Sequence, residues 1–497
     1  MNMKCSVILL AFTVSYASGI SNRSFPADFK FGVTTAAYQI EGGWNEDGKG
    51  ESLWDWYTHT YPDRIQGGTN ADVTCDSYHK YKEDIEILKD LGVNFYRLSI
   101  AWSRILPEGT VNHVNQAGVD YYRTVFQLLI DNGIVPVVTL YHWDVPLTLS
   151  EIGGWTNPLL VDYFADYARL AFELFGDQVK QWHTFNEPQS FCMLSYQGPL
   201  RKAPGYDLPA EAVYQCNYVV LKAHAKAYHI YDDEFRQKQQ GNISIVLVAH
   251  WKEPASDSDA DKEGQNLALQ FEMGLLANPI FNGNWPQVAI DRVAERSKLE
   301  GYPRSRLPEF TQEEIDYIKG TADYFGLNHY TTELVSFAYN VTNVTEYPSF
   351  DADRGVLRTT DPSWPQSNMT WLRSVPWGFR KMLNWIDQSY GHPAILVTEN
   401  GWADDGTSRE DPQRISYIQD YLTALLEAIY DDGVNVIGYS QWSIYDNFEW
   451  LSGYMAKFGL VYVDFSSPNR TRTPKSSYYY YQKIIKTKCL VDTCDAA

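Results

Sequence analysis

The sequence predicts a single-domain α/β protein, a (β/α)8 barrel of the TIM-barrel class with long loops between its later strands. Eight short apolar segments, rich in β-branched and aromatic residues, alternate with longer segments of helical periodicity along the chain. The strand candidates are almost continuously apolar, as in parallel strands that are buried on both faces. No Pro/Ser-rich linker or charge block separates two halves of the chain. These observations favour one closed barrel.

The predicted strands are 29–35, 95–100, 135–141, 182–186, 243–249, 324–330, 395–399 and 436–444. The predicted helices include 77–91, 118–132, 158–175, 210–235, 377–390 and 412–431. The first of these helices is followed by Gly92, a residue suited to ending it. An open doubly wound sheet is the alternative, but no Gly-rich phosphate turn follows the first strand. The longest connections lie between strands five and six and between six and seven, where we expect them to build a pocket mouth.

The first residues predict a secretory signal peptide. Lys4 precedes an apolar run over residues 7–14, and the small residues Ala17, Ser18 and Gly19 follow. The run is too short to span a bilayer, so we expect residues 1–19 to be removed and 20–497 to form a secreted catalytic domain. Six N-glycosylation sequons are consistent with this, at Asn22, Asn242, Asn340, Asn343, Asn368 and Asn469.

Cysteine use also fits an oxidising compartment. Once Cys5 is removed with the signal peptide, five cysteines remain, so one stays unpaired or bonds elsewhere. Cys489 and Cys494 are close enough in sequence to close a small loop. The sequence leaves open whether Cys192 pairs with Cys216.

Composition limits the partners of the chain. A formal net charge of −21 argues against nucleic acid and against an anionic membrane surface. The ten His residues are scattered, so we expect no metal site and no cofactor. The sixteen Trp and thirty-six Tyr residues supply rings that suit the faces of sugars, although most are expected to pack in the core.

Two predicted strands end in a carboxylate. Glu187 follows the fourth strand and Glu399 closes the seventh, so both are expected at the carboxyl face of the barrel. Cleavage of a glycosidic bond requires such a pair, in which a protonated group donates to the leaving oxygen and an ionised one attacks or activates water. The pair therefore predicts a glycosidase.

Other strand ends supply supporting groups. Arg97 is expected to keep Glu399 ionised, since a nearby cation lowers a carboxyl pKa, and Tyr330 can donate to the same carboxylate. Asn186 is placed to bond the sugar's 2-hydroxyl, a contact that strengthens in the transition state. The remaining strand-end candidates are Gln39, His142, Asn328 and Trp442.

Four motifs occur in an order that resembles a known family. Residues 184–188 (TFNEP) and 396–401 (LVTENG) look like the acid/base and nucleophile motifs of family 1 glycoside hydrolases, the β-glucosidase and myrosinase-like family. Residues 29–42 are similar to its amino-terminal signature and 446–450 (DNFEW) to its late sugar-binding signature. The resemblance extends over residues 29–464, nearly all of the mature chain.

The resemblance implies a retaining double displacement on a terminal β-D-glucosyl residue. Glu399 would be the nucleophile and Glu187 the acid/base. Gln39, His142, Asn328, Glu449 and Trp450 would bind sugar hydroxyls, with Trp442 as the stacking floor. It further implies a small glycoside or oligosaccharide substrate and a monomer or homodimer.

Two alternatives stay open. One is a myrosinase-type thioglucosidase that acts on glucosinolates; plant members replace the acid/base Glu with Gln, whereas this chain keeps Glu187. The other is a catalytically silent carbohydrate-binding relative, a class that typically loses one catalytic Glu. Arg201 and Lys202 depart from the family's usual uncharged segment, and they either face an anionic aglycone or lie in a solvated loop, which we favour.

Overall fold

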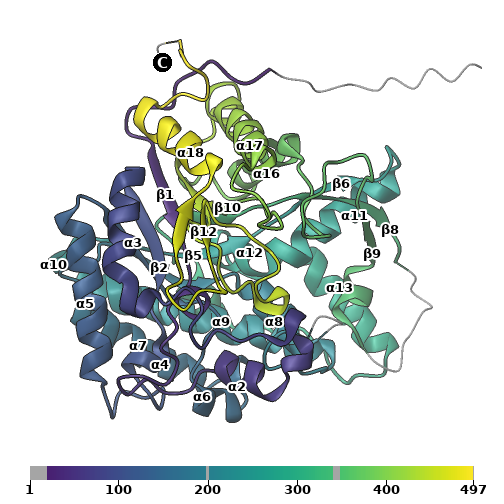
Figure 1. Cartoon of the computed structure of the whole chain (residues 1–497). Coiled ribbons are helices and arrows are strands. Elements are labelled where there is room, and N and C mark those ends of the chain that lie inside the picture. The colour runs from purple at the N-terminus through teal and green to yellow at the C-terminus, as the bar shows by residue number, and fades with distance from the viewer. Residues whose placement is uncertain (1–18, 198–200, 340–347, 496–497) are drawn as a thin grey trace, which may run out of the picture.

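The structure, a computed structural model, describes residues 19–197, 201–339 and 348–495. Eight parallel strands close into a barrel with helices around it, as predicted (Figure 1). Around the barrel the order is β1, β11, β10, β7, β5, β4, β3, β2. These strands are β1 (Lys30–Thr34), β2 (Phe95–Ser99), β3 (Val135–Tyr141), β4 (Gln181–Asn186), β5 (Asn242–Val248), β7 (Phe325–Asn328), β10 (Ile395–Asn400) and β11 (Val436–Trp442).

Two strands end earlier than predicted, because their last residues change partners. Beyond Trp442, the main chain of Ser443 and Ile444 bonds to Phe458 and Val461 instead of continuing the barrel ladder. Beyond Asn328, the His329 N–H donates to the Glu399 carbonyl at 2.9 Å, where β7 and β10 slip out of register. Both departures lie at the carboxyl face, where the chain leaves the barrel to build the site.

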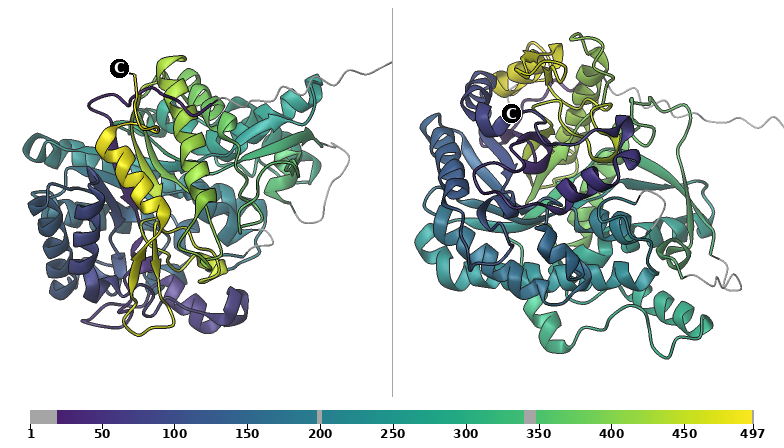
Figure 2. Two further views of the ribbon diagram at one scale, coloured as in Figure 1. Left: turned by 45° about the horizontal axis from the view of Figure 1, so that its top comes forward. Right: turned by 60° about the horizontal axis from the view of Figure 1, so that its bottom comes forward.

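The outer helices agree closely with the predicted ones. They are α3 (Ser77–Leu91), α5 (Gln116–Asp131), α7 (Leu160–Phe175), α9 (Ala210–Ile230), α16 (Pro376–Ser389) and α17 (Pro412–Tyr430). Gly92 ends α3 with a φ of 78°, a left-handed conformation that glycine adopts readily. The helix predicted over 210–235 is helical throughout, because a π-helical segment, Tyr231–Arg236, continues α9 beyond Ile230 and leads into α10 (Gln237–Gln239). The final helix, α18 (Ser476–Thr487), packs between α17 and α3, next to the strands' outer face (Figure 2).

A three-stranded sheet escaped prediction. It consists of β6 (Trp251–Pro254), β8 (Thr332–Phe337) and β9 (Val356–Thr359), with β8 in the middle, and stands beside the barrel (Figure 1). Strand β6 follows β5 and β8 follows β7, so this sheet extends the carboxyl side of those two barrel strands. The long connections predicted to shape a pocket mouth therefore contain ordered structure of their own.

The remaining elements belong mostly to the loops. They are α1 (Ala37–Ile40), α2 (Leu53–Thr60), α4 (Trp102–Ile105), α6 (Leu147–Glu151), α8 (Pro188–Tyr196), α10 (Gln237–Gln239), α11 (Asp259–Leu269), α12 (Leu275–Phe281), α13 (Gln287–Leu299), α14 (Gln312–Ile318), α15 (Phe350–Arg354), β12 (Val461–Val463) and β13 (Arg472–Pro474). Of the described helices, none is both long and apolar enough to cross a membrane.

The structure shows which cysteines form disulfides. Cys192 bonds to Cys216, which ties α8 to α9, and Cys489 bonds to Cys494 near the end of the chain. Cys75 is buried and unpaired. Four sequon asparagines, Asn22, Asn242, Asn368 and Asn469, lie on exposed positions. Asn340, Asn343 and residues 1–18 of the predicted signal peptide lie outside the described residues.

Candidate active site

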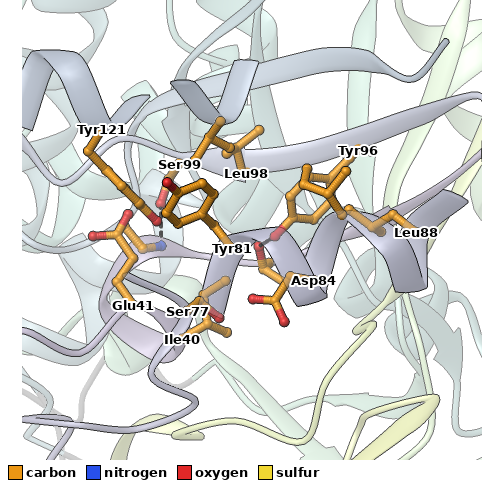
Figure 3. A pocket seen from close by; sticks show the side chains of 14 residues that line it. Ile40, Glu41, Ser77, Tyr81, Asp84, Leu88, Tyr96, Leu98, Ser99 and Tyr121 are labelled. Atoms are coloured by element: carbon orange, nitrogen blue, oxygen red, sulfur yellow. Dashed lines mark hydrogen bonds between the residues drawn. The ribbon is translucent and has the colours of Figure 1, made fainter. Parts of the chain in front are cut away.

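Two cavities lie close to the barrel, and they differ greatly in size. The smaller, of about 30 Å³, sits among Glu41, Ser77, Asp84, Tyr96 and Tyr121 (Figure 3). It has room for water and is too small for a sugar. The larger measures about 480 Å³ and opens at the carboxyl ends of the strands. Its volume is typical of a small-molecule site, and both Glu187 and Glu399 line it.

Glu399 on β10 is held by two donors, one from β2 and one from the segment that follows β7. Arg97 Nη1 lies 2.6 Å from Glu399 Oε1, and the Tyr330 hydroxyl donates to Oε2 at 2.8 Å. Arg97 is itself fixed, because its Nε–H contacts Thr139 Oγ1 at 3.2 Å and His183 Nδ1 at 3.3 Å. The carboxylate is therefore locked in one orientation at the cavity wall.

The charge state of Glu399 differs from the sequence-based expectation. Its pKa is raised to about 7, because burial and, to a smaller extent, the nearby Glu187 raise it by more than Arg97 and Tyr330 lower it. Desolvation outweighs the cation because the side chain is almost fully removed from water. The predicted contact with Arg97 is present and lowers the pKa of Glu399 as expected, but the opposite effect of burial is larger.

Glu187 lies where β4 turns into α8. Its φ of 48° is left-handed, unusual for a non-glycine residue, and Pro188 then begins the helix. Asn328 Nδ2 donates to Glu187 Oε1 at 2.7 Å, and the Ser190 hydroxyl donates to Oε2 at 2.8 Å. Both oxygens of this carboxyl group thus have a partner.

One amide links the two carboxylates. Asn186 Oδ1 accepts from Arg97 Nη2 at 2.7 Å and from Asn328 Nδ2 at 3.2 Å. Asn328 Oδ1 in turn accepts from the Thr398 hydroxyl at 2.7 Å. Both N–H groups of Asn328 are therefore engaged by protein, and its Oδ1 accepts one hydrogen bond. The structure shows that it supports Glu187; its binding of a sugar hydroxyl, which the family resemblance implied, stays a prediction.

Two other predicted sugar-binding residues keep a free polar atom. His142 is neutral, because burial and Arg97 hold its pKa well below the usual range. Its Nε2 accepts from Asn186 Nδ2 at 3.0 Å, so the proton sits on Nδ1, which has no partner among the described residues. Gln39 Nε2 donates to the Phe448 carbonyl at 2.9 Å, while its buried Oε1 likewise lacks one. His142 lines the large cavity, so its donor is left for a substrate hydroxyl, whereas Gln39 is not among the residues that line that cavity.

The predicted aromatic and acidic residues meet at the same end of the cavity. Glu449, Trp450 and Trp442 all line it. The rings of His142 and Trp442 stack with centroids 6.1 Å apart, and Trp143 packs on Trp450 at 4.5 Å. Burial raises the pKa of Glu449 to about 8. This end combines flat apolar rings with polar edges, as sugar binding requires.

The two basic residues after α8, Arg201 and Lys202, lie in different environments. Arg201 is exposed and pairs with Asp207 at 3.1 Å, as expected of a solvated loop. Lys202 instead lines the cavity, with Nζ 4.1 Å from the centroid of the Trp143 ring. Burial lowers its pKa to about 8. Residues 198–200 of that stretch lie outside the described residues.

Sequence reasoning missed several cavity residues. Ser190 was detectable in principle, since it lies one helical turn after Glu187. Most of the others come from helices, from the unpredicted sheet or from a loop, where no strand-end signal marks them, whereas His250 directly follows the predicted fifth strand. They include Gln189, Asn217, His250, Glu272, Glu333, Arg358 and Trp371.

Comparison with known proteins agrees with this geometry. The model of glycosyl hydrolase family 1 matches residues 21–490. The chain belongs to that family. Myrosinase 1 of Brevicoryne brassicae is 47% identical over 467 residues, covering 93% of this chain and 98% of that protein. Human cytosolic β-glucosidase is 42% identical, covering 94% and 99%. The structure of a rice β-glucosidase, Os3BGlu6, superposes with a TM-score of 0.88 at 38% identity, covering 96% and 100%.

Family membership makes the chain a glycoside hydrolase that acts on O-glycosyl bonds. The cavity of this member of glycosyl hydrolase family 1 has what such chemistry needs. It presents two carboxyl groups with different partners, a guanidinium beside one of them, and polar atoms left over for the substrate. Within the described residues, no group of three or more His, Cys, Asp or Glu side chains is arranged to hold a metal ion.

Proposed function

We propose that the protein is a secreted retaining β-glucosidase that releases terminal non-reducing β-D-glucosyl residues. One observation carries the proposal: Glu187 and Glu399 line one cavity, each held by its own donors and linked through Asn186 and Arg97. This arrangement gives one carboxyl group a fixed cation and the other only neutral donors. The two can therefore take different roles in one reaction.

The proposed first step forms a glycosyl ester. The ionised Glu399 attacks the anomeric carbon while the Glu187 carboxyl gives its proton to the glycosidic oxygen, and the aglycone leaves as an alcohol. A free N–H of Asn186 bonds the 2-hydroxyl, and this bond strengthens as positive charge develops on the ring. His142 Nδ1–H and Gln39 Oε1 bind further hydroxyls.

In the second step the Glu187 carboxylate removes a proton from water. The resulting nucleophile attacks the anomeric carbon, the ester bond to Glu399 breaks, and glucose departs in its original configuration. A mutant of the similar rice β-glucosidase has been seen in a covalent complex with glucose, which supports an ester intermediate here.

The stereochemical course tests the mechanism. Proton NMR of the first product from p-nitrophenyl β-D-glucoside should show the β-anomer of glucose before mutarotation produces the α-anomer. If the α-anomer appears first, the enzyme inverts and Glu399 is not a nucleophile. A panel of glucosides, galactosides and fucosides, assayed by kcat/KM, tests the preference for glucose.

A thioglucosidase is the second candidate, because a myrosinase has the highest identity among the relatives reported above. A thiolate leaves without protonation, so loss of the acid should scarcely slow the first step on a thioglucoside, while the second step still loses its base. Sinigrin and an alkyl β-glucoside distinguish the two functions. Turnover of sinigrin by wild type, a single-turnover burst of its aglycone in Glu187→Gln, and little turnover of the alkyl glucoside by wild type would favour the thioglucosidase.

Secretion is proposed from the amino-terminal segment, and the two disulfides and four exposed sequons support it. Expression of the full chain in insect cells tests it. We expect the enzyme in the medium, with its amino terminus near residue 20 and a mass that falls on treatment with an N-glycosidase. An enzyme that stays inside the cells and keeps residues 1–19 would contradict it.

A further inference from the structure

A loop at the rim of the large cavity brings two of its side chains into the cavity wall. This rim loop, residues 366–373, lies between β9 and α16, and its Met369 and Trp371 line the cavity. An antiparallel bridge between Gln366 and Arg373 closes the base of the loop. The place of Trp371 therefore depends on the contacts that hold the rest of the loop against the barrel.

The side chain of Asn368 holds this loop. Its Nδ2 donates to the Met455 carbonyl at 2.9 Å and to the Asp404 carbonyl at 3.3 Å. Asp404 follows β10, which carries Glu399, and Met455 follows β11. A primary amide has two N–H groups, and here each reaches a different loop at the carboxyl face. One side chain thus fastens the rim loop to the loops that follow two barrel strands.

The fastened loops meet in the cavity wall. Leu451 and Ser452, from the loop after β11, line the cavity, and the Ser452 hydroxyl contacts the Met369 sulfur at 3.8 Å. The rim loop also presents Trp371, whose ring meets that of Tyr330 edge-on with centroids 5.8 Å apart. This part of the wall is therefore continuous only while the rim loop stays in place.

Asn368 is at the same time the acceptor of an N-glycosylation sequon, Asn368-Met369-Thr370. Glycosylation of a sequon transfers an oligosaccharide from a lipid-linked diphosphate to Nδ2. The bond between nitrogen and sugar carbon forms, the bond between the oligosaccharide and the diphosphate breaks, and one amide proton is lost. A glycosylated Asn368 therefore has one N–H left and keeps at most one of its two hydrogen bonds.

Two other sequons lack this conflict. The side-chain amide nitrogens of Asn242 and Asn469 donate to no other described residue, so a glycan on either removes no such contact. At Asn368, which is exposed at the rim, the glycan and the second hydrogen bond compete for one nitrogen atom.

We infer that Asn368 is a positioning residue of the cavity rim and that an N-glycan on its sequon, added in the secretory pathway, loosens the rim loop. With one of two hydrogen bonds lost, the loop holds Trp371 less firmly against an aryl aglycone. Binding weakens, while Glu187 and Glu399 keep their donors and the rate of bond cleavage is unchanged. The inference rests on the proposed function, since it assumes secretion and the cleavage of aryl glucosides.

Four proteins expressed in the same insect cells test the inference: wild type, Asn368→Asp, Thr370→Val and Asn469→Asp. Thr370→Val destroys the sequon but keeps Asn368, so it is the reference for the fastened loop. Asn368→Asp places an oxygen that cannot donate opposite two carbonyl oxygens. We expect its KM for p-nitrophenyl β-D-glucoside to be about fivefold above that of Thr370→Val, the loss of one ring contact, with kcat changed less than about twofold.

Wild type reports on the glycan itself. Mass spectrometry of the peptide that contains Asn368 should show a glycan, and the KM of this wild type should exceed that of Thr370→Val by about two- to threefold, because one hydrogen bond remains. Asn469→Asp is the matched control: it makes the same change of charge and also destroys a sequon, but it lies outside the cavity lining and should keep the KM of wild type.

Adding Trp371→Leu to Thr370→Val and to Asn368→Asp shows whether Asn368 acts through the ring. The two double variants should then differ in KM by less than about twofold, because the side chain that the loop positions is gone. A fivefold difference that persists between them would overturn the inference.

Three other results would also overturn it. They are equal KM values in Asn368→Asp and Thr370→Val, an unmodified Asn368 peptide in secreted wild type, and a glycosylated wild type with the KM of Thr370→Val. Wild type that reaches the medium but does not cleave the glucoside would instead overturn the proposed activity, and wild type that stays inside the cells would overturn the proposed secretion.

Discussion

The two halves of the large cavity differ in how far their polar side chains are hydrogen-bonded to the protein. Around Glu187 and Glu399, each carboxyl oxygen has a donor between 2.6 and 2.8 Å away, and the donors are fixed in turn. The other half, which we call the aglycone half, is lined by Gln189, Asn217, Arg358 and Trp371. In the aglycone half, Asn217 Oδ1 and Gln189 Oε1 have no donor among the described residues, and Arg358 Nη1 lies 3.6 Å from Glu272 Oε1. The two carboxyl groups of the first half are thus fully bonded without substrate, whereas the two acceptors of the second half are not.

This difference separates chemistry from selection. Preorganised donors need no rearrangement when charge develops, so they stabilise a transition state efficiently. Unpaired acceptors do nothing for bond cleavage, but they penalise any aglycone that cannot donate to them. We therefore expect substitutions in the first half to change the rate or its pH dependence for every substrate. Substitutions in the second half should change the ranking of substrates.

The largest effect is expected from Glu399→Gln. The amide cannot attack the anomeric carbon, so kcat should fall by roughly 10⁴-fold or more on every glycoside. Initial rates on the aryl glucoside and cellobiose measure this. Glu253→Gln is the control, since Glu253 is also paired with a cation, Lys381, but lies outside the cavity. A loss of kcat in Glu399→Gln that differs between the two substrates would contradict the proposed division, in which one half performs the chemistry and the other selects the substrate.

Glu187→Ala should discriminate by leaving group. An alkyl glucoside needs protonation of its oxygen and should lose about 10²- to 10⁴-fold in kcat/KM, the range of general acid catalysis. p-Nitrophenol leaves more readily, so its glucoside should lose less in the first step. Added azide, a nucleophile that needs no general base, should restore turnover of the aryl substrate by forming a glycosyl azide. Equal losses on both glucosides would contradict the role of Glu187.

Tyr330→Phe tests the electrostatics of the catalytic half. The hydroxyl lowers the pKa of Glu399, so its removal should raise that pKa above the value of about 7. Glu399 must be ionised to attack, so activity is lost as pH falls through its pKa. The acid limb of the profile of kcat/KM against pH should therefore move to higher pH, by on the order of one unit. Tyr421→Phe is the control, because its hydroxyl donates to the Tyr330 carbonyl and not to Glu399. An unmoved acid limb would contradict the account.

The smallest effect is expected from Trp371→Leu. Loss of the ring removes a stacking contact worth about 1 kcal/mol, which is roughly a fivefold change in binding. The KM of the aryl glucoside should rise by about that factor, while the pH at which kcat/KM reaches its acid limb stays unchanged. A moved acid limb would show that the aglycone half also sets the charge of Glu399.

Sequence patterns predicted the barrel and its reactive centre well. All eight strands were found because buried parallel strands are short apolar runs, and Glu187, Glu399, Arg97 and Tyr330 gather as expected because parallel strands end on one face. The sheet of β6, β8 and β9 was missed, since its strands are short and partly polar. The sign of the Glu399 pKa shift was missed because burial depth is not visible in a sequence. Asn217 and Gln189 were missed because they lie on helices, where an amide side chain gives no signal.

Trapping the intermediate tests the central claim most directly. The enzyme is incubated with a 2-deoxy-2-fluoro-β-D-glucosyl substrate that carries a good leaving group, then digested with protease, and the peptides are sequenced by mass spectrometry. The account predicts one added fluoroglucosyl group, attached to Glu399. A label on any other residue, or full turnover with the α-anomer as first product and no label at all, would contradict it.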